Sequence, residues 1–274
     1  MSSDNLYRIR SSRKASNHVF DDISKPCVYS PINFGLPVSL KGSGVKIAII
    51  DTGMPDHSDI SNIFDGVDMS DSSKGSLDTH GHATMVAGII GSKNRKTVTG
   101  IATEADLLFA KVANSSGKCS FNAVSTSVLW SIVKNVDIIL ISLASGYDFQ
   151  LLHDAVKKAN QNNICVIAAS EGTADNVEYP AGYEEVIAIG RSARGKTRQF
   201  KSVGSNGVKI MFPDTNMYTT YLHNRYTKAS GSSLTAALAA GVSVLLIEKA
   251  KQTTGSRLTP SEIKNQLASL SYCP

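Results

Sequence analysis

The sequence predicts an α/β fold, a three-layer sandwich in which a mostly parallel central sheet lies between layers of helices. Three observations favour it: short apolar runs recur along the chain, helical patterns lie between them, and 42% of the 274 residues are hydrophobic. Strands that read as continuous apolar runs are typical of parallel sheets covered on both faces. A chain of this length can bury one sizeable core, so we expect a single domain over residues 28–274.

The predicted strands are six apolar runs, at residues 45–50, 107–113, 136–142, 164–170, 185–190 and 208–213. The predicted helices cover residues 84–90, 123–134, 149–160, 233–251 and 260–269. The last has the clearest start signal, because Thr259 precedes Pro260 and Glu262 follows in the first turn. In such sheets functional groups gather just beyond the carboxyl ends of the strands, which is where Asp51 stands.

Residues 1–27 are polar and charged and show neither a helical nor a strand period. We expect an arm that wraps the domain or stays disordered. The arm lacks the apolar stretch of about 7 to 15 residues that a secretory signal needs. Nor does the chain contain about 18 consecutive uncharged apolar residues. We therefore expect no membrane partner and a cytoplasmic or otherwise intracellular location.

Charge and cysteine spacing argue against nucleic-acid binding and against paired cysteines. The 28 basic and 23 acidic residues leave a formal charge of +5 with both signs scattered, so we expect no nucleic-acid partner. Cys27, Cys119, Cys165 and Cys273 are widely spaced and form no CxxC pair, which predicts free thiols. Cys165 lies inside an apolar run and is expected to fill core space.

Three motifs bring together an acid, a base and a hydroxyl. Asp51-Thr52-Gly53 closes the first strand, GHATMVAG occupies residues 81–88, and GSSLTAALAAG occupies residues 231–241. A serine hydroxyl is a poor nucleophile until an imidazole takes its proton, and the imidazole needs a carboxylate to fix its tautomer. The chain order Asp, His, Ser is one of those known for such triads.

These motifs, in this order, resemble those of the subtilisin-like serine proteases, the subtilase family. The resemblance implies Asp51 as the acid and His82 as the base, since GHATMVAG keeps six of the eight positions of the family's G-H-G-T-H-V-A-G. Choosing His80 would shift the rest of the motif by two residues. The gapless match of GSSLTAALAAG implies Ser233 as the nucleophile, at a helix start that favours developing negative charge.

The resemblance also implies a polypeptide substrate that lies as an extended strand between two walls. The implied contacts are Asn114, Ser115, Ser116 and Gly117 on one wall and Ser142, Leu143, Ala144 and Ser145 on the other. Tyr179-Pro180-Ala181 matches a family element near the specificity pocket, where the resemblance implies a cis proline.

The chain departs from the family where an asparagine amide stabilises the oxyanion. It reads Ala168-Ala169-Ser170-Glu171, so a gapless alignment places Glu171 there and a one-residue shift places Ser170. In this family, losing that amide costs roughly 10²–10³ in turnover. A serine hydroxyl or a protonated Glu171 could donate instead, whereas an ionised Glu171 would repel the oxyanion. The protonated form predicts activity that rises at acidic pH.

The resemblance implies calcium ligands at Asp59 and Asn94, but Lys93, Arg95 and Lys96 in the same loop would repel a divalent cation. We therefore expect no required cofactor.

The leading hypothesis is a serine endopeptidase. The alternative is a pseudoprotease that uses the groove to bind peptides or as a scaffold. The intact Asp, His and Ser favour the enzyme, and the missing amide favours the binder. The arm could be a short pro-segment, the protein could fold unaided, or the chain could be a mature form. The sequence leaves the oligomeric state and the cleavage-site preference open.

Overall fold

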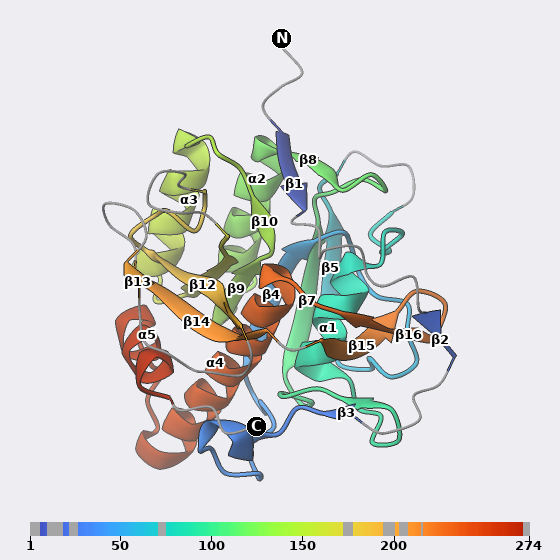
Figure 1. The fold of residues 1–274 in the computed structure, drawn as a ribbon. Coiled ribbons are helices and arrows are strands. Elements are labelled where there is room, and N and C mark those ends of the chain that lie inside the picture. The colour runs from blue at the N-terminus through green and yellow to red at the C-terminus, as the bar shows by residue number, and fades with distance from the viewer. Residues whose placement is uncertain are drawn as a thin grey trace.

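The computed structural model describes residues 6–9, 19–21, 27–70, 75–171, 178–193, 201–202, 208–214 and 216–270. Within them, the central sheet has eight strands in the order β13-β14-β12-β11-β9-β4-β7-β5 (Figure 1). Its strands are β4 (Lys46–Asp51), β5 (Ile63–Asp68), β7 (Asp106–Lys111), β9 (Ile138–Ile141), β11 (Cys165–Ala169), β12 (Val186–Ala193), β13 (Lys201–Ser202) and β14 (Val208–Asp214). All neighbours run parallel except β13 and β14.

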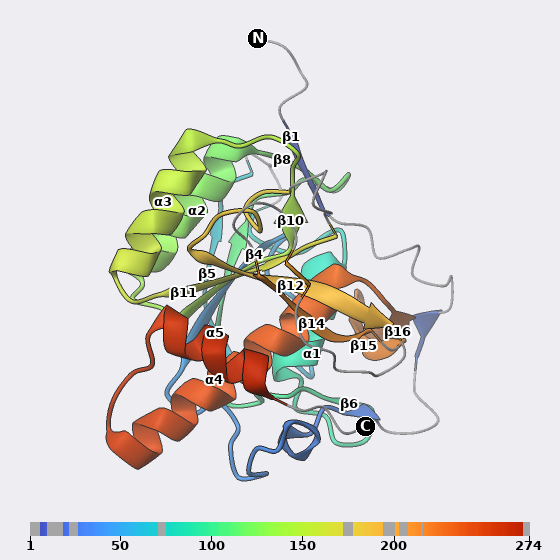
Figure 2. The same ribbon diagram turned by 60° about the vertical axis from the view of Figure 1, so that its left-hand side comes forward.

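Helices cover both faces of this sheet, as Figure 2 shows. The helices on one face are α1 (His82–Gly91), α4 (Ser232–Thr254) and α5 (Pro260–Ser269), and those on the other are α2 (Phe121–Val133) and α3 (Gln150–Gln161). Along β4, Ile47 and Ile49 pack toward the first group while Ala48 and Ile50 pack toward the second. Both faces are dry, which is why the strand reads as an unbroken apolar run. The predicted three-layer α/β fold is confirmed.

The predicted elements are present with ends shifted by up to three residues. The start of α5 has the expected chemistry: Glu262 N–H donates to Thr259 Oγ1 at 3.2 Å, and Thr259 N–H donates to the Glu262 carboxylate at 2.8 Å. This reciprocal cap satisfies amide groups that the first turn would leave free.

Several elements were not anticipated. β5 is a half-exposed edge strand whose sequence IFDGVD lacks an apolar run. The hairpin of β15 (Met217–Tyr221) and β16 (Arg225–Ala229) turns through His223 and Asn224, which have φ of 61° and 56°. It pairs with β2 (Val19–Phe20). The remaining short elements are β3 (Cys27–Val28), β6 (Val98–Thr99) and the 3₁₀ helix Pro31–Phe34.

The hairpin supports α1 directly. The Thr219 and Thr220 hydroxyls donate to the backbone carbonyls of Met85 and Thr84 at 2.6 and 2.7 Å. A Cβ at Gly88 would collide with these hydroxyls, so glycine permits the close approach.

α4 is the one helix in the described residues that is long and apolar enough to cross a membrane, but 89% of its most apolar window is buried inside the protein. Core helices pass the same test of length and composition, and α4 contacts β9, β11, β12 and β14. We therefore assign it to the core.

The described part of the N-terminal arm is not free of regular structure, because residues 6–9 form a strand. β1 (Leu6–Ile9) lies between β8 (Lys118–Ser120) and β10 (Leu143–Ala144) and pairs antiparallel with both (Figures 1 and 2). The composition of residues 1–27 gave no strand signal, since the pairing is supplied by two distant segments of the domain.

Candidate active site

Asp51 and His82 form a buried pair at the carboxyl edge of the sheet. Asp51 ends β4 and His82 begins α1, and their exposures are 0% and 1%. His82 Nδ1 lies 2.8 Å from each carboxylate oxygen of Asp51, so Nδ1 carries the proton and Nε2 keeps its lone pair. Burial lowers the pKa of His82, but the charge of Asp51 and its hydrogen bond prevail and raise the pKa above its ordinary value.

Asp78 holds the start of α1 in place. Its Oδ1 accepts from the Gly81 N–H at 2.9 Å and from the Thr52 hydroxyl at 2.8 Å. Its Oδ2 accepts from the Thr84 N–H and hydroxyl at 2.9 and 2.6 Å, and Thr52 Oγ1 accepts the Ala83 N–H. Sequence reasoning missed this residue, although an acid just before a helix is a recognised start signal.

Ser233 is the second residue of α4, which packs against α1, and it is 1% exposed. Its hydroxyl lies 3.4 Å from the Ser142 carbonyl oxygen, to which it donates. His82 Nε2 is buried and has no hydrogen-bond partner among the described residues. The structure thus joins Asp51 to His82 directly and directs the hydroxyl of Ser233 to the wall at Ser142.

β1 pairs with one of the two walls expected to hold substrate, at Leu143 and Ala144, and with β8, the strand that follows the other expected wall at residues 114–117. Arg8 is in register with Ala144 on one side and Lys118 on the other, and Ile9 is in register with Leu143. Asn114, Ser115, Ser116 and Gly117 form a turn in which Asn114 Oδ1 accepts the Ser116 and Lys118 amides at 2.9 and 3.1 Å. The strand that faces β1 begins after this turn, at Lys118.

The two candidate oxyanion residues lie at the end of β11. The Ser170 N–H donates to the Ile189 carbonyl at 2.8 Å, and Ser170 is 6% exposed. Glu171 Oε1 accepts the Ser232 hydroxyl at 3.1 Å and lies 3.3 Å from Arg191 Nε. The Glu171 carboxylate is therefore part of an ion pair and adjoins the residue before Ser233.

Glu178 brings a second carboxylate to this region, and sequence reasoning missed it. It is 5% exposed, and its Oε2 accepts the Glu171 N–H at 3.1 Å. The next residue, Tyr179, exchanges two backbone hydrogen bonds with Ser145, at 2.8 and 3.0 Å, so the wall at Ser142–Ser145 lies beside this segment. The Tyr179–Pro180 bond is cis, as the resemblance implied.

The implied calcium site does not fit the residues present. The Asp59 carboxylate accepts the Tyr226 hydroxyl at 2.6 Å and the Asn94 Nδ2 amide at 3.1 Å, with the Thr97 hydroxyl at 3.4 Å. Donor hydrogens therefore surround the oxygens that a cation would need. No group of three or more His, Cys, Asp or Glu residues in the described ranges could hold a metal ion.

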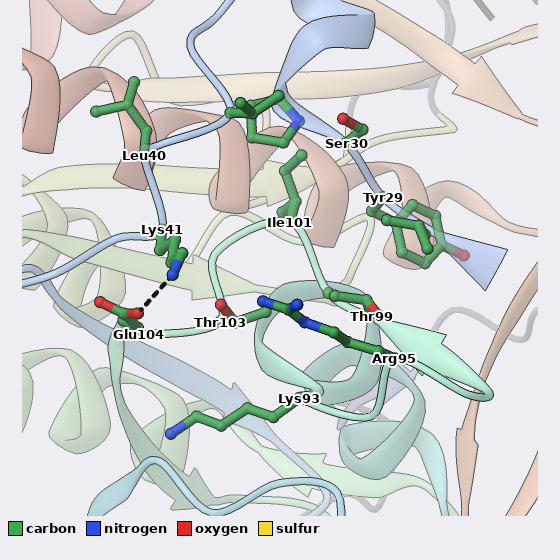
Figure 3. A pocket seen from close by; sticks show the side chains of 14 residues that line it. Tyr29, Ser30, Leu40, Lys41, Lys93, Arg95, Thr99, Ile101, Thr103 and Glu104 are labelled. Atoms are coloured by element: carbon green, nitrogen blue, oxygen red, sulfur yellow. Dashed lines mark ion pairs between the residues drawn. The ribbon is translucent and has the colours of Figure 1, made fainter. Parts of the chain in front are cut away.

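A pocket of about 500 Å³ lies away from Ser233 and is shown in Figure 3. Lys93 and Arg95 come from one loop, and Lys41, which also lines the pocket, pairs with Glu104 at 3.2 Å. It contains none of the residues that the sequence predicted for the site.

The described cysteines contribute no nucleophile. Cys27, Cys119 and Cys165 are free thiols, as predicted, while Cys273 lies outside the described residues. Burial raises the pKa of Cys119 and of Cys165 to about 12, so both stay protonated at neutral pH.

Comparison with known proteins identifies the family of this chain. The family model described as "Subtilase family" matches residues 42–269. Subtilisin DY of Bacillus licheniformis is 34% identical over 84% of this chain and 84% of its own length, and an intracellular serine protease of Paenibacillus polymyxa is 34% identical over 83% and 74%. The minor extracellular protease Epr of Bacillus subtilis is 36% identical over 82% of this chain, which spans only 35% of Epr. The chain belongs to the subtilase family of serine proteases.

Proposed function

We propose that this chain is a serine endopeptidase in which Ser233 is the nucleophile, His82 the general base and Asp51 the group that orients His82. The observation that carries the proposal is the buried Asp51–His82 pair, in which the Nε2 atom of His82 has no partner within the described part of the chain. Burying an imidazole nitrogen without a hydrogen bond is unfavourable. The role of a base that must receive the proton of Ser233 explains why this nitrogen is left without one.

The reaction begins when the Ser233 hydroxyl rotates from the Ser142 carbonyl to His82 Nε2. Catalytic hydrogen bonds are often long or misaligned before substrate binds, so the 3.4 Å contact to Ser142 is compatible with this step. His82 takes the proton as Oγ attacks the scissile carbonyl, and Asp51 stabilises the imidazolium. His82 then gives the proton to the leaving amine, and water releases the acyl group from Ser233.

The oxyanion would be stabilised by the Ser233 N–H and the Ser170 hydroxyl. The first helical hydrogen bonds of α4 come from Leu234 and Thr235, so the Ser233 amide precedes them and is available. The ion pair with Arg191 supports an ionised Glu171, which argues against a protonated Glu171 as the donor. Arg191 also offsets the repulsion that this carboxylate would exert.

The substrate would be a polypeptide bound as an extended strand, with no cofactor, nucleic acid or membrane required. β1 supports this mode, because it already lies as an extended strand between β10 and β8 and pairs with both. We also propose that the arm acts as a short pro-segment, since substrate must displace β1. The similarity to an intracellular serine protease of Paenibacillus polymyxa supports an intracellular location.

Labelling with a fluorophosphonate tests the nucleophile directly. The wild-type chain should label from about pH 4 to about pH 9 with increasing efficiency, and Ser233→Ala should abolish the label. Ser243→Ala, which removes a buried serine further along α4, should leave labelling unchanged. A folded wild-type sample that stays unlabelled at every pH would favour the pseudoprotease instead.

A further inference from the structure

Lys111 is a buried basic residue that the proposed mechanism does not use. It ends β7 beside Asp51, its register partner at the end of β4, and it is 1% exposed. Leu107 and Phe109, at alternate positions of the same strand, pack on the face covered by α1, so the Lys111 side chain leaves the sheet on that face too. A lysine is rarely buried so completely, because its ammonium group gives up hydrogen bonds with water. This position is costly unless the ammonium group has other partners.

The partners of the ammonium group are two backbone carbonyls of one loop. Lys111 Nζ donates to the carbonyl oxygen of Gly75 at 2.9 Å and to that of Leu77 at 2.7 Å. Both of these residues are exposed, Leu77 by 44%, so buried apolar side chains contribute little to the position of the loop. Lys111 therefore holds residues 75–77 at both ends.

The same loop lies against the turn that follows β4. The Met54 N–H donates to the Ser76 carbonyl at 2.7 Å, and the Met54 carbonyl accepts the Asp78 N–H at 2.8 Å. A Cβ at Gly53 would lie 2.7 Å from the Ser76 oxygen, so glycine permits this close approach. The position of Asp78 is thus determined by the turn on one side and, through the loop, by Lys111 on the other.

Asp78 connects the loop to the residue we propose as general base. Its carboxylate accepts the N–H groups of Gly81 and Thr84, each at 2.9 Å. His82 lies between these two residues, as the first residue of α1. A displacement of Asp78 would therefore move the first turn of α1 and turn His82 Nε2 away from Ser233.

We infer that Lys111 is a positioning residue for proton transfer. It holds residues 75–77 and thereby Asp78, which keeps His82 in the orientation that accepts a proton from Ser233. Hydrogen bonds from an ammonium ion are charge-assisted and directional, so they resist displacement of an exposed loop. A misplacement of about 1 Å in a catalytic group can cost about 10²-fold in rate. The inference rests on the proposed function and adds a residue that supports it.

Lys111→Met in the full chain tests the inference, because methionine fills a similar volume but donates no hydrogen bond. We expect kcat on a fluorogenic peptide to fall by about 10²-fold while KM stays within about twofold. Lys111→Arg keeps donors for both carbonyls and should recover at least about 10-fold of this loss. The rate of fluorophosphonate labelling should follow kcat, because labelling also requires a proton to leave Ser233.

Two further measurements distinguish positioning from a general structural role. The proton that His82 Nδ1 shares with Asp51 is expected to give a low-field proton NMR signal. This signal should broaden or disappear in Lys111→Met and return in Lys111→Arg. In a double-mutant cycle, adding Lys111→Met to Asp78→Asn should lower kcat by less than about threefold, because the two residues act in series.

Lys46→Met is the matched control. Lys46 begins β4 at the opposite edge of the sheet, where its Nζ lies 4.6 Å from the centroid of the Phe64 ring. This change should leave kcat and the NMR signal at their wild-type values. Wild-type kcat in Lys111→Met would overturn the inference, and so would equal losses in the methionine and arginine variants or additive losses in the cycle. If Lys111→Met does not fold, Lys111→Gln, whose amide can reach one carbonyl, should show an intermediate loss of kcat, and wild-type kcat there would also overturn the inference.

Failure of the proposed function would look different, since no peptide would be cleaved and no fluorophosphonate bound by any variant. The low-field signal of His82 then provides an independent readout, because it requires the Asp51–His82 pair but no catalysis. A signal that is lost in Lys111→Met and kept in Lys46→Met supports the positioning role. A signal that is unchanged in Lys111→Met contradicts it.

Discussion

The two sides of the site are built differently. On the side of β4 and α1, Asp51 and His82 are almost wholly buried and lie 2.8 Å apart, and the Thr52 N–H donates to Asp51 at 2.7 Å. Beside them, the Thr52 and Thr84 hydroxyls both donate to Asp78. On the side of β11 and β12, the structure has a partly exposed network of charges; the side chains of Glu171 and Arg191 are 31% and 32% exposed. The difference teaches that burial fixes Asp51 and His82 in one arrangement, whereas the charged side chains of Glu171 and Arg191 remain partly open to solvent.

Asp51→Asn should produce the largest effect, because it changes the buried Asp51–His82 pair, which proton transfer requires in one arrangement. An asparagine amide facing His82 Nδ1 favours the wrong tautomer and removes the charge that stabilises the imidazolium. We expect kcat/KM to fall by about 10⁴-fold while the far-ultraviolet circular dichroism is unchanged. Asp154→Asn, on the exposed surface of α3, is the control. A loss smaller than about 10-fold would mean that the pair is not the proton-transfer machinery.

Ser170→Ala tests the side of the site formed by β11 and β12. If the Ser170 hydroxyl donates to the oxyanion, its loss should lower kcat by about 10²-fold and leave KM nearly unchanged, because the bond forms only in the transition state. Ser131→Ala removes a buried serine hydroxyl from α2, remote from the site, and should leave kcat at the wild-type value. An unaltered kcat in Ser170→Ala would show that another group donates the hydrogen bond to the oxyanion.

The two sides also differed in how well the sequence predicted them. Asp51 and His82 stand in motifs whose neighbours in sequence are their neighbours in space, so strand end and helix start could be placed from the residues alone. Glu178, Arg191 and Asp214 come from three separate segments, and only the folded sheet brings them to Glu171. No local sequence pattern predicts these contacts.

The same reason explains which parts of the fold were missed. The six strands with apolar runs were predicted because burial on both faces is visible in each run. β1 lacks such a signal, since its hydrogen bonds depend on β8 and β10, more than 100 residues away along the chain. Asp78 is intermediate: its position before α1 is a start signal, but its contact with Thr52 depends on the tertiary fold.

The pH profile distinguishes the two sides by the sign of its slope. His82 must be neutral to accept a proton, and its pKa lies above the ordinary 6.5, so kcat/KM should increase with pH through an apparent pKa above 6.5. Below that value the rate should fall about tenfold per pH unit. The protonated form of His82 stabilises the fold at pH below 6.5, and this contribution is lost as the pH rises through the raised pKa. Activity that increased toward acid would favour a protonated Glu171 instead.

The smallest expected effect concerns the loop where the family resemblance implied calcium. Tyr226→Phe removes the 2.6 Å hydrogen bond to Asp59 and should lower the free energy of unfolding by about 1 to 2 kcal/mol. Because donor hydrogens already surround the Asp59 carboxylate, the melting temperature should not change when calcium or a chelator is added. Tyr147→Phe, which alters an exposed tyrosine, controls for the loss of a hydroxyl. A melting temperature that rises with calcium and falls with a chelator would contradict this prediction. It would show that the Asp59 carboxylate exchanges its hydrogen-bond donors for the ion and that the loop binds calcium.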